Sequence, residues 1–352
     1  MRLEFINKIK VGEVLGRNIF TNSGSILLRT GVILNELYIK KLKELGVFYV
    51  YVEDARLCDI SVEDEKLSDL KAITMKNMVK IMKNVTGANK KVAEESLSVV
   101  SNLVNHIIVM GEVNKSLYDI QTYDNYFYLH SIDTGIMAIF LGISMDFSEN
   151  ELKELGIYAI IHDVGITKID KNIITKTGKL TDEEIKEIKM HPIYGKEILE
   201  KNFFMSCEVL EAVECHHERV DGSGYPYGLI NNEISKFAKI IGVCDVYNDA
   251  LNNRCYRERF NPRDAYELIL AGCGNDFDEE VVNHFKKTFS VFPLGSCLKL
   301  SNGVEGYVIK QNKNFPDRPI IRVLYENETR EPIKFYEIDL LKCHNIRVHS
   351  VI

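Results

Sequence analysis

The sequence predicts a mainly α protein with a small α+β unit before the helical part and a small β-rich unit after it. In the middle of the chain, apolar residues recur at helical spacing, as in Leu97, Val100 and Leu103. After residue 290, short β-prone runs alternate with turn residues. The chain has 352 residues and is 45% hydrophobic, which is enough for two or three domains. We expect boundaries at 1–60, 61–96, 97–289 and 290–352.

The first 60 residues predict a compact mixture of strands and one helix. Residues 18–21 and 25–28 flank Gly24 and are expected to form two strands. Residues 36–45 are amphipathic and end at Gly46, as expected for a glycine-terminated helix. Residues 47–52 are all β-branched or aromatic and predict a strand. This unit is too short for a receiver domain and carries no chemistry, so we expect an interaction or regulatory role.

The overall composition excludes some classes of function. A net charge of −7 argues against broad nucleic-acid binding, although a local basic pocket can still bind a small anion. No run approaches the ~20 apolar residues of a membrane span, and the first residues do not resemble a secretory signal, so we expect a cytoplasmic location. The eight cysteines include no C-x-x-C pair, which favours reduced thiols.

The most informative stretch is residues 216–226, where two adjacent histidines run into a glycine-rich turn. Neighbouring helical side chains diverge by about 100°, so His216 and His217 suit two nearby ions, or one ion and its surroundings. Gly222 and Gly224 allow positive φ or close backbone approach, and Pro226 fixes the exit from the turn. Two capped histidines beside an ordinary loop are the alternative.

Other parts of the chain supply further donors. His162 and Asp163 offer a neutral nitrogen and a carboxylate able to bridge two cations. His130 lies on an aromatic-rich helical stretch. His191 closes the helix that begins after Thr181, and Pro192 places it at a terminus or kink.

Asp245 is informative because it lies in the apolar helix predicted for 234–251. Aspartate is seldom buried unless it is paired or bound to a metal, and a salt bridge to an arginine is the alternative. Arg254 and Arg257 follow about one turn apart and can form a fork for phosphate oxygens, or lie on the surface.

Taken together, these elements closely resemble the HD-GYP family of metal-dependent phosphohydrolases. The resemblance covers roughly residues 97–289 and implies an HD-type helical bundle as the catalytic domain. Its motifs contain His130, His162-Asp163, His191, His216-His217, Asp221-Gly222-Ser223-Gly224-Tyr225-Pro226 and Asp245.

Five histidines and two carboxylates are too many donors for one ion but suit two metals about 3.5–4 Å apart, with Asp163 as the bridge. The donor types allow iron, manganese or zinc, and the resemblance favours a di-iron site. The expected metal ligands are His130, His162, Asp163, His191, His216, His217 and Asp245, with His162 and Asp163 also named as catalytic.

The resemblance implies that the substrate is cyclic di-GMP, opened to pGpG and then cut to GMP. Gly224, Tyr225 and Pro226 would shape the pocket, and Arg254 and Arg257 would hold phosphates. A homodimer, or a signalling partner reached through the flanking units, is also expected.

Departures from the family pattern keep other functions open. The family usually has a lysine after H-D-x-G, where this chain has Ile166, and the D-x-x-D pattern ends here in Asn248. A metal-containing sensor or scaffold that binds the nucleotide without cutting it is one alternative. An HD hydrolase for another phosphate ester is the other.

Overall fold

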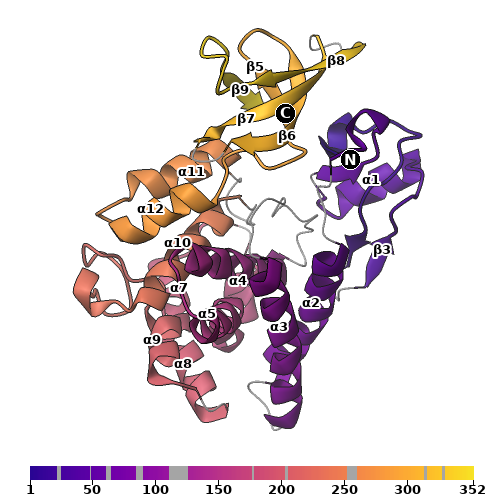
Figure 1. Ribbon diagram of the computed structural model, residues 1–352. Helices are drawn as coiled ribbons and strands as arrows, with labels where there is room; N and C mark the ends of the chain where they lie inside the picture. Colours follow the sequence, from indigo (N-terminus) through magenta and orange to yellow (C-terminus); the bar gives the residue numbers. More distant parts are fainter. Residues whose placement is uncertain are drawn as a thin grey trace.

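The computed structural model describes residues 1–21, 25–47, 49–60, 65–84, 90–110, 126–176, 178–202, 205–251, 260–312, 315–326 and 330–352. An N-terminal unit, a helical middle and a C-terminal sheet follow one another along the chain (Figure 1). This arrangement confirms the predicted mainly α class with two small flanking units. None of the described helices is both long and apolar enough to cross a membrane.

The N-terminal unit contains two short antiparallel strand pairs and one helix. Its elements are β1 (Arg2–Phe5), β2 (Ile19–Phe20), β3 (Ile26–Leu28), α1 (Glu36–Glu44) and β4 (Tyr49–Val52). β1 pairs with β4, and β2 pairs with β3. The side chain of Asn35 caps α1 by accepting from the amide of Tyr38. Strand β1 was not predicted from the sequence.

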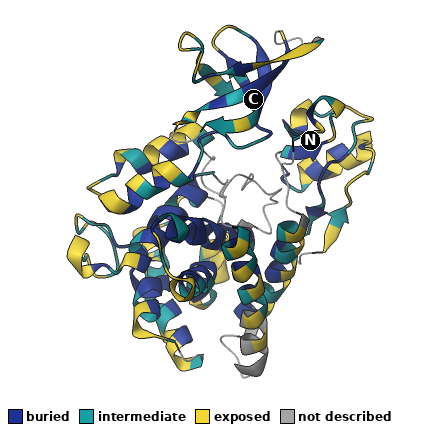
Figure 2. Ribbon diagram, in the orientation of Figure 1, coloured by how far each residue is buried: buried dark blue, intermediate teal, exposed yellow. Residues whose placement is uncertain are grey.

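The helical middle is built around one helix that is buried along most of its length. Its helices are α2 (Glu65–Asn84), α3 (Lys90–Met110), α4 (Tyr126–Ser144), α5 (Glu149–Ile161), α6 (Lys171–Ile174), α7 (Asp182–Ile188), α8 (His191–Asn202), α9 (Cys207–Cys215), α10 (Lys236–Leu251), α11 (Pro262–Ala271) and α12 (Glu279–Thr288). Residues 129–142 of α4 are all buried, and α3, α5, α10 and α12 pack around it. Figure 2 shows this buried helical core in dark blue. Such a helix can hold polar side chains only where they find partners.

His191 corrects one sequence prediction. The predicted helix after Thr181 begins with a capping box between Thr181 and Glu184, but it ends at Ile188. His191 is instead the first residue of α8, with Pro192 in the first turn, where a missing amide costs nothing. The expected placement at a helix terminus is correct, but at the opposite end of a different helix.

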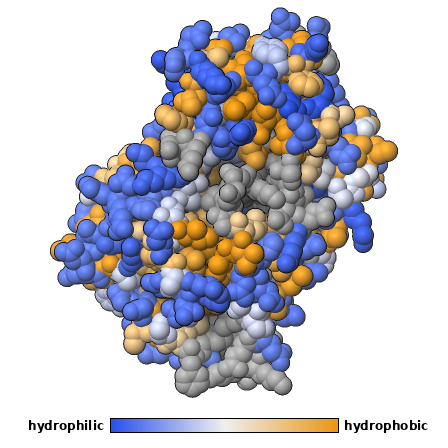
Figure 3. Space-filling model, viewed as in Figure 1, coloured by the Kyte–Doolittle hydropathy of each residue, from blue (hydrophilic) through white to orange (hydrophobic). Residues whose placement is uncertain are grey.

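The C-terminal sheet has five antiparallel strands in the order β8-β7-β6-β5-β9. They are β5 (Cys297–Leu300), β6 (Glu305–Asn312), β7 (Phe315–Tyr325), β8 (Pro332–Asp339) and β9 (Val348–Val351). The β-prone runs near 297, 306 and 320 correspond to β5, β6 and β7. On the face shown in Figure 3, hydrophilic residues cover much of the outline, while apolar residues gather on this sheet and over the helical middle.

The N-terminal unit contacts the C-terminal sheet directly. The amide of Leu3 donates to the carbonyl of Gly295 at 3.0 Å. Beside it, the buried carboxylate of Glu4 accepts from Arg2, Tyr307 and Arg330. Arg330 also pairs with Glu305 at 2.9 Å. We call the contact made by Arg2, Glu4, Glu305, Tyr307 and Arg330 the junction.

Candidate metal centre

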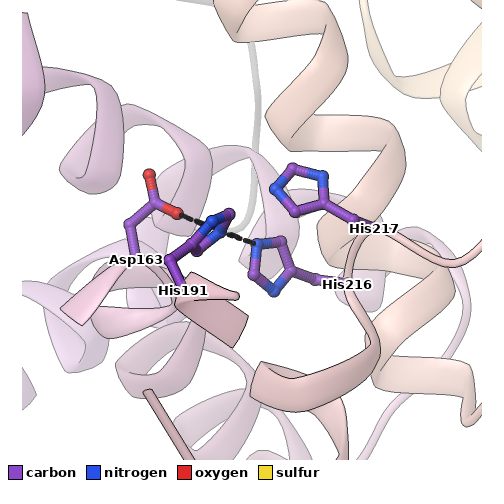
Figure 4. A group of neighbouring side chains, drawn as sticks. All are labelled: Asp163, His191, His216 and His217. Carbon is purple, nitrogen blue, oxygen red and sulfur yellow. Dashed lines mark hydrogen bonds and ion pairs between the residues drawn. The ribbon is translucent and has the colours of Figure 1, made fainter. Parts of the chain in front are cut away.

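The structure brings together the seven residues expected to bind metal, although they come from five places in the chain. They form two groups, Asp163 with His191, His216 and His217, and His130 with His162 and Asp245. Within each group, the candidate ligand atoms lie within 4.8 Å of one another. Figure 4 shows the first group, with Asp163 and His216 on either side of His191. The geometry therefore provides room for two ions.

Two glycines allow the backbone segments that carry these side chains to meet. Gly165 follows the His162-Asp163 pair, and a Cβ there would lie 1.9 Å from the carbonyl oxygen of His191. Gly242 lies one turn before Asp245, and its Cβ would lie 2.7 Å from the carbonyl oxygen of His216. Only glycine permits approaches this close. These two contacts place His191 beside Asp163, and α10 beside α9.

Three histidines are oriented in the same way, each by the helix that ends just before it. The Nδ1 atoms of His162, His191 and His216 each lie 2.7 Å from the carbonyl oxygen three residues earlier. A carbonyl only accepts, so each Nδ1 carries the proton and donates it. Each Nε2 then presents its lone pair to the centre, as in histidines whose other nitrogen is fixed by a hydrogen bond.

These lone pairs require a cation. Nε2 of His191 and Nε2 of His216 lie 3.4 Å apart, and neither has a proton to donate in this tautomer. Nε2 of His162 is buried without a hydrogen-bond partner in the described part of the chain. Buried acceptors that face one another are unfavourable unless a proton or a metal lies between them.

The two carboxylates each face both groups. Oδ1 of Asp163 lies 3.2 Å from Nε2 of His191, while its Oδ2 lies 3.6 Å from Nε2 of His162. Oδ1 of Asp245 lies 2.9 Å from Nε2 of His130, and its Oδ2 lies 3.7 Å from Nδ1 of His217. Both aspartates therefore have the geometry of bridging ligands.

Burial and charge set the protonation states of the centre. Burial lowers the pKa of His216, and it lowers the pKa of His217 further, with His216 adding to the effect. Burial opposes charge on Asp163 and Asp245, but the facing histidines outweigh it and hold each pKa well below its usual value. Neutral histidines together with ionised carboxylates are the protonation states that bind metal.

His162 behaves differently from its neighbours. Burial disfavours its charged form, but Asp163 and Asp245 outweigh that effect and raise its pKa to about 9. Without a metal, this imidazole therefore carries a second proton, on Nε2, at neutral pH, and that nitrogen presents a lone pair only once this proton is lost. An ion bound here would displace that proton, so metal binding should release protons and become stronger as pH rises.

The donor set fits divalent metals of intermediate hardness. It contains imidazole nitrogens and carboxylate oxygens, which suit iron, manganese and zinc. Cys215, next to His216, takes no part: it is 3% exposed, packs against Ile234 and Ala238, and burial raises the pKa of its thiol to about 12. A thiolate ligand is therefore absent from these two groups.

Comparison with known proteins agrees with this geometry. Residues 130–281 match the family model of the HD domain, and residues 297–352 match that of the KOW domain associated with HD domains. The cyclic di-GMP phosphodiesterase PA4108 of Pseudomonas aeruginosa is 32% identical over 225 residues, 64% of this chain and 54% of that protein. The cyclic di-GMP phosphodiesterase PdeB of Borreliella burgdorferi is 28% identical over 58% of this chain and 53% of its own length.

This chain carries an HD-GYP domain. The chain spans about half the length of these two relatives. Some other curated relatives are named 3'3'-cGAMP-specific phosphodiesterases. A solved structure, Bd1817, an HDG"Y"P protein from Bdellovibrio bacteriovorus, has a TM-score of 0.50 at 15% identity and covers 80% of this chain and 97% of that one, which supports the fold alone.

The GYP turn of this HD-GYP domain covers one side of the centre. Gly222 has φ 83°, and a Cβ at Gly224 would lie 2.3 Å from the amide nitrogen of Arg219. Tyr225 precedes Pro226 through a cis peptide bond and stacks on His217, with ring centroids 4.7 Å apart and planes inclined by 25°. The turn thus places an aromatic wall against a candidate metal ligand.

The remaining predicted substrate contacts, Arg254 and Arg257, lie outside the described residues. Two positioning residues were not predicted. Oδ1 of Asn248 lies 2.7 Å from Nδ1 of His130 and so fixes that ring, one turn after Asp245. The carboxylate of Glu218 accepts from the amides of Tyr227 and Leu229 and closes the GYP turn. The sequence signal that could have indicated Asn248 and Glu218 is their position next to the motifs, because histidine ligands usually have a hydrogen-bond partner that fixes the ring.

Proposed function

We propose that this chain is a metal-dependent cyclic dinucleotide phosphodiesterase that hydrolyses cyclic di-GMP to pGpG, and pGpG further to GMP. The observation that carries the proposal is the pair of adjacent ligand groups, faced by both Asp163 and Asp245, with the Nε2 atoms of His191 and His216 directed toward each other. The curated relatives support the substrate class, and the cGAMP-specific ones make mixed cyclic dinucleotides the nearest alternative substrates.

In this proposal, two divalent ions, iron or manganese, would supply Lewis-acid charge and activate a water for attack on phosphorus. His191, His216 and His217 would hold one ion, and His130 and His162 would hold the other. Asp163 and Asp245 would provide carboxylate ligands between the two groups. Asn248 fixes the ring of His130, and the carbonyls behind His162, His191 and His216 keep their Nε2 lone pairs directed inward.

The flanking parts belong to the same proposal. Residues 97–289 form the catalytic domain, with 61–96 as a helical connector and with 1–60 and 290–352 as flanking domains. Gly224, Tyr225 and Pro226 shape the substrate pocket, and Arg254 and Arg257 contact phosphates. A homodimer, or a signalling partner acting through the flanking domains, would regulate the site.

Ile166 supports a second candidate function. It stands where the family usually has a lysine, and it is part of the short helix Val164–Lys168 directly after Asp163. A domain that keeps its metal ligands but lacks this cation can bind the nucleotide without cutting it. The second candidate is therefore a metal-containing cyclic dinucleotide sensor.

One experiment separates these possibilities. Protein purified anaerobically with iron or manganese is incubated with cyclic di-GMP, 3'3'-cGAMP and simple phosphate esters, and the products are separated by chromatography. His162→Ala and Asp163→Ala are compared with His344→Ala, which removes an exposed histidine far along the chain. Production of pGpG or GMP by the wild type and His344→Ala alone supports the enzyme. Binding without cleavage supports the sensor, and cleavage of phosphate esters alone would refute both.

A further inference from the structure

His217 is the most exposed of the seven ligand candidates. The side chain of His217 is 17% exposed, while those of the other six ligand candidates are at most 9% exposed. Solvent, and hence a substrate, therefore approaches past His217. Tyr225 stacks on this histidine, so its ring borders the approach.

A lysine lies beside that border. Lys189 is exposed, and its Nζ lies 5.1 Å from the centroid of the Tyr225 ring. It is held there by the backbone, because it caps the end of α7 two residues before His191. Among the described residues, Lys189 has no carboxylate within ion-pair distance. Other lysines of this region are neutralised, such as Lys176 by Glu184 and Lys196 by Glu214.

Lys168 is the other cation close to the metal motifs in sequence. It ends the short helix that contains Ile166, and it too is exposed. However, no described contact links Lys168 with Tyr225 or with any of the seven ligand candidates. The two lysines therefore form a matched pair: both are exposed and lie near a ligand candidate in sequence, but only Lys189 contacts Tyr225.

We propose that Lys189 binds the second phosphate of the cyclic dinucleotide substrate, the one that is not being cleaved. This inference rests on the proposed function. A cyclic dinucleotide carries two phosphodiesters, and only one can occupy the buried centre. Lys189 contacts Tyr225, which in turn stacks on His217. Its ammonium group is therefore placed to bind the second phosphate outside the buried ligand cluster. A flexible lysine binds phosphate as a point charge and needs no paired geometry.

A purely structural role for Lys189 makes different predictions. A cation over a tyrosine ring that is not fully buried, such as Tyr225, adds about 0.5–1 kcal/mol, and could simply hold this ring against His217. In that case, loss of Lys189 would misplace the wall of the pocket for every substrate. It would also leave the salt dependence of the reaction unchanged, because no charge pair with substrate would be lost.

The test compares a substrate that has two phosphodiesters with one that has a single phosphodiester. The kinetic parameters kcat and KM are measured for cyclic di-GMP and for bis(p-nitrophenyl) phosphate at several salt concentrations. The proteins are the wild type, Lys189→Met, Lys189→Arg and the control Lys168→Met, all with metal content determined. Methionine keeps the apolar stem, and arginine keeps the charge.

We expect Lys189→Met to lower kcat/KM for cyclic di-GMP about 10-fold, mainly through KM, as for loss of one charged hydrogen bond. Its salt dependence should become shallower, and cleavage of bis(p-nitrophenyl) phosphate should stay within about twofold of wild type. Lys189→Arg should recover most of the loss, and Lys168→Met should match the wild type.

An equal loss on both substrates, an unchanged salt dependence, or no loss at all would overturn the inference while leaving the proposed function intact. If the wild type binds cyclic di-GMP without cutting it, the same variants are compared by dissociation constant, with the same 10-fold expectation. If the wild type neither binds nor cuts cyclic di-GMP, the proposed function fails, and this inference fails with it.

Discussion

The metal centre and the junction both gather charged residues from distant parts of the chain, but they leave different balances of charge. At the junction, Glu4 is 1% exposed and accepts from Arg2, Tyr307 and Arg330, while Arg330 also pairs with Glu305. Each charged group there has a partner of opposite charge. In the centre, by contrast, Nε2 of His191 and Nε2 of His216 face each other as acceptors 3.4 Å apart, because the Nδ1 of each ring donates to a backbone carbonyl.

This difference separates a structural cluster from a binding site. A buried network with matched donors and acceptors contributes to folding, and nothing further is needed to complete it. A buried cluster with an excess of acceptors is incomplete until a cation binds. Pairing, rather than the number of charged residues, therefore distinguishes the two regions.

The largest expected effect is on the centre. His216→Ala removes one of the two facing Nε2 atoms, so a metal would lose a ligand and hydrolysis should fall at least about 10³-fold. Metal content by mass spectrometry and product formation by chromatography measure this. Retention of both metal and activity in His216→Ala would contradict the role given to this cluster.

At the junction, the expected effect is on stability. Glu4→Gln removes the anion that Arg2 and Arg330 share, although Arg2 keeps Glu13 and Asp54 and Arg330 keeps Glu305. Loss of these charged hydrogen bonds should therefore cost about 1.5–3 kcal/mol of unfolding free energy. Glu331→Gln, at an exposed position, is the matched control. Denaturant unfolding gives the difference, and hydrolysis by the folded Glu4→Gln protein should be unchanged. A Glu4→Gln protein as stable as Glu331→Gln would show that the network is not stabilising.

Asn248 tests the support around the centre. Asn248→Ala removes the hydrogen bond that fixes His130, and should lower metal affinity or activity about 10- to 100-fold. Asn248→Asp keeps an oxygen at this place and should lose much less. Metal titration of the three proteins provides the comparison, and equal losses in both variants would argue against an acceptor role for Asn248.

The smallest effect concerns an outer contact between the N-terminal unit and the sheet. Arg322 pairs with Asp59 at 2.6 Å, and this hydrogen-bonded pair lowers the pKa of Asp59 from 3.8 to about 2. A lowered pKa means that the contribution to stability is present above pH 4 and is lost as the pH falls through 2. The melting temperatures of wild type and Asp59→Asn should thus differ slightly at pH 5, and the difference should shrink below pH 4 and vanish as the pH falls through 2. A constant difference would exclude this pair as the cause.

The seven ligand candidates that lie together in the structure could be selected from the sequence because their signals are local. His216 and His217 adjoin a glycine-rich turn, and Asp245 stands out in an apolar helix, so residue type and neighbours were sufficient to select them. The end of the helix before His191 could not be predicted from the sequence. This helix, α7, already ends at Ile188, and His191 begins the next helix, α8. Helix ends depend on capping geometry, which the pattern of apolar residues does not fix.

The junction and the contact between Lys189 and Tyr225 could not be predicted in this way. β1 forms by pairing with β4, and Glu4 is buried because Arg330 reaches it from another domain, so neither follows from nearby residues. Lys189 looks like any exposed lysine until the fold places Tyr225 beside it. Asn248 was read as a departure from the family pattern, and only the structure shows its contact with His130.

The junction also has a consequence for synthesis on the ribosome. Glu4 and Arg330 are separated by 326 residues along the chain. At about 5–20 residues per second, translation of that interval takes roughly 15–65 s. During this time the carboxylate of Glu4 lacks the arginine and tyrosine that come from the sheet. The N-terminal unit can therefore fold early but acquires its full set of contacts only when the last domain emerges.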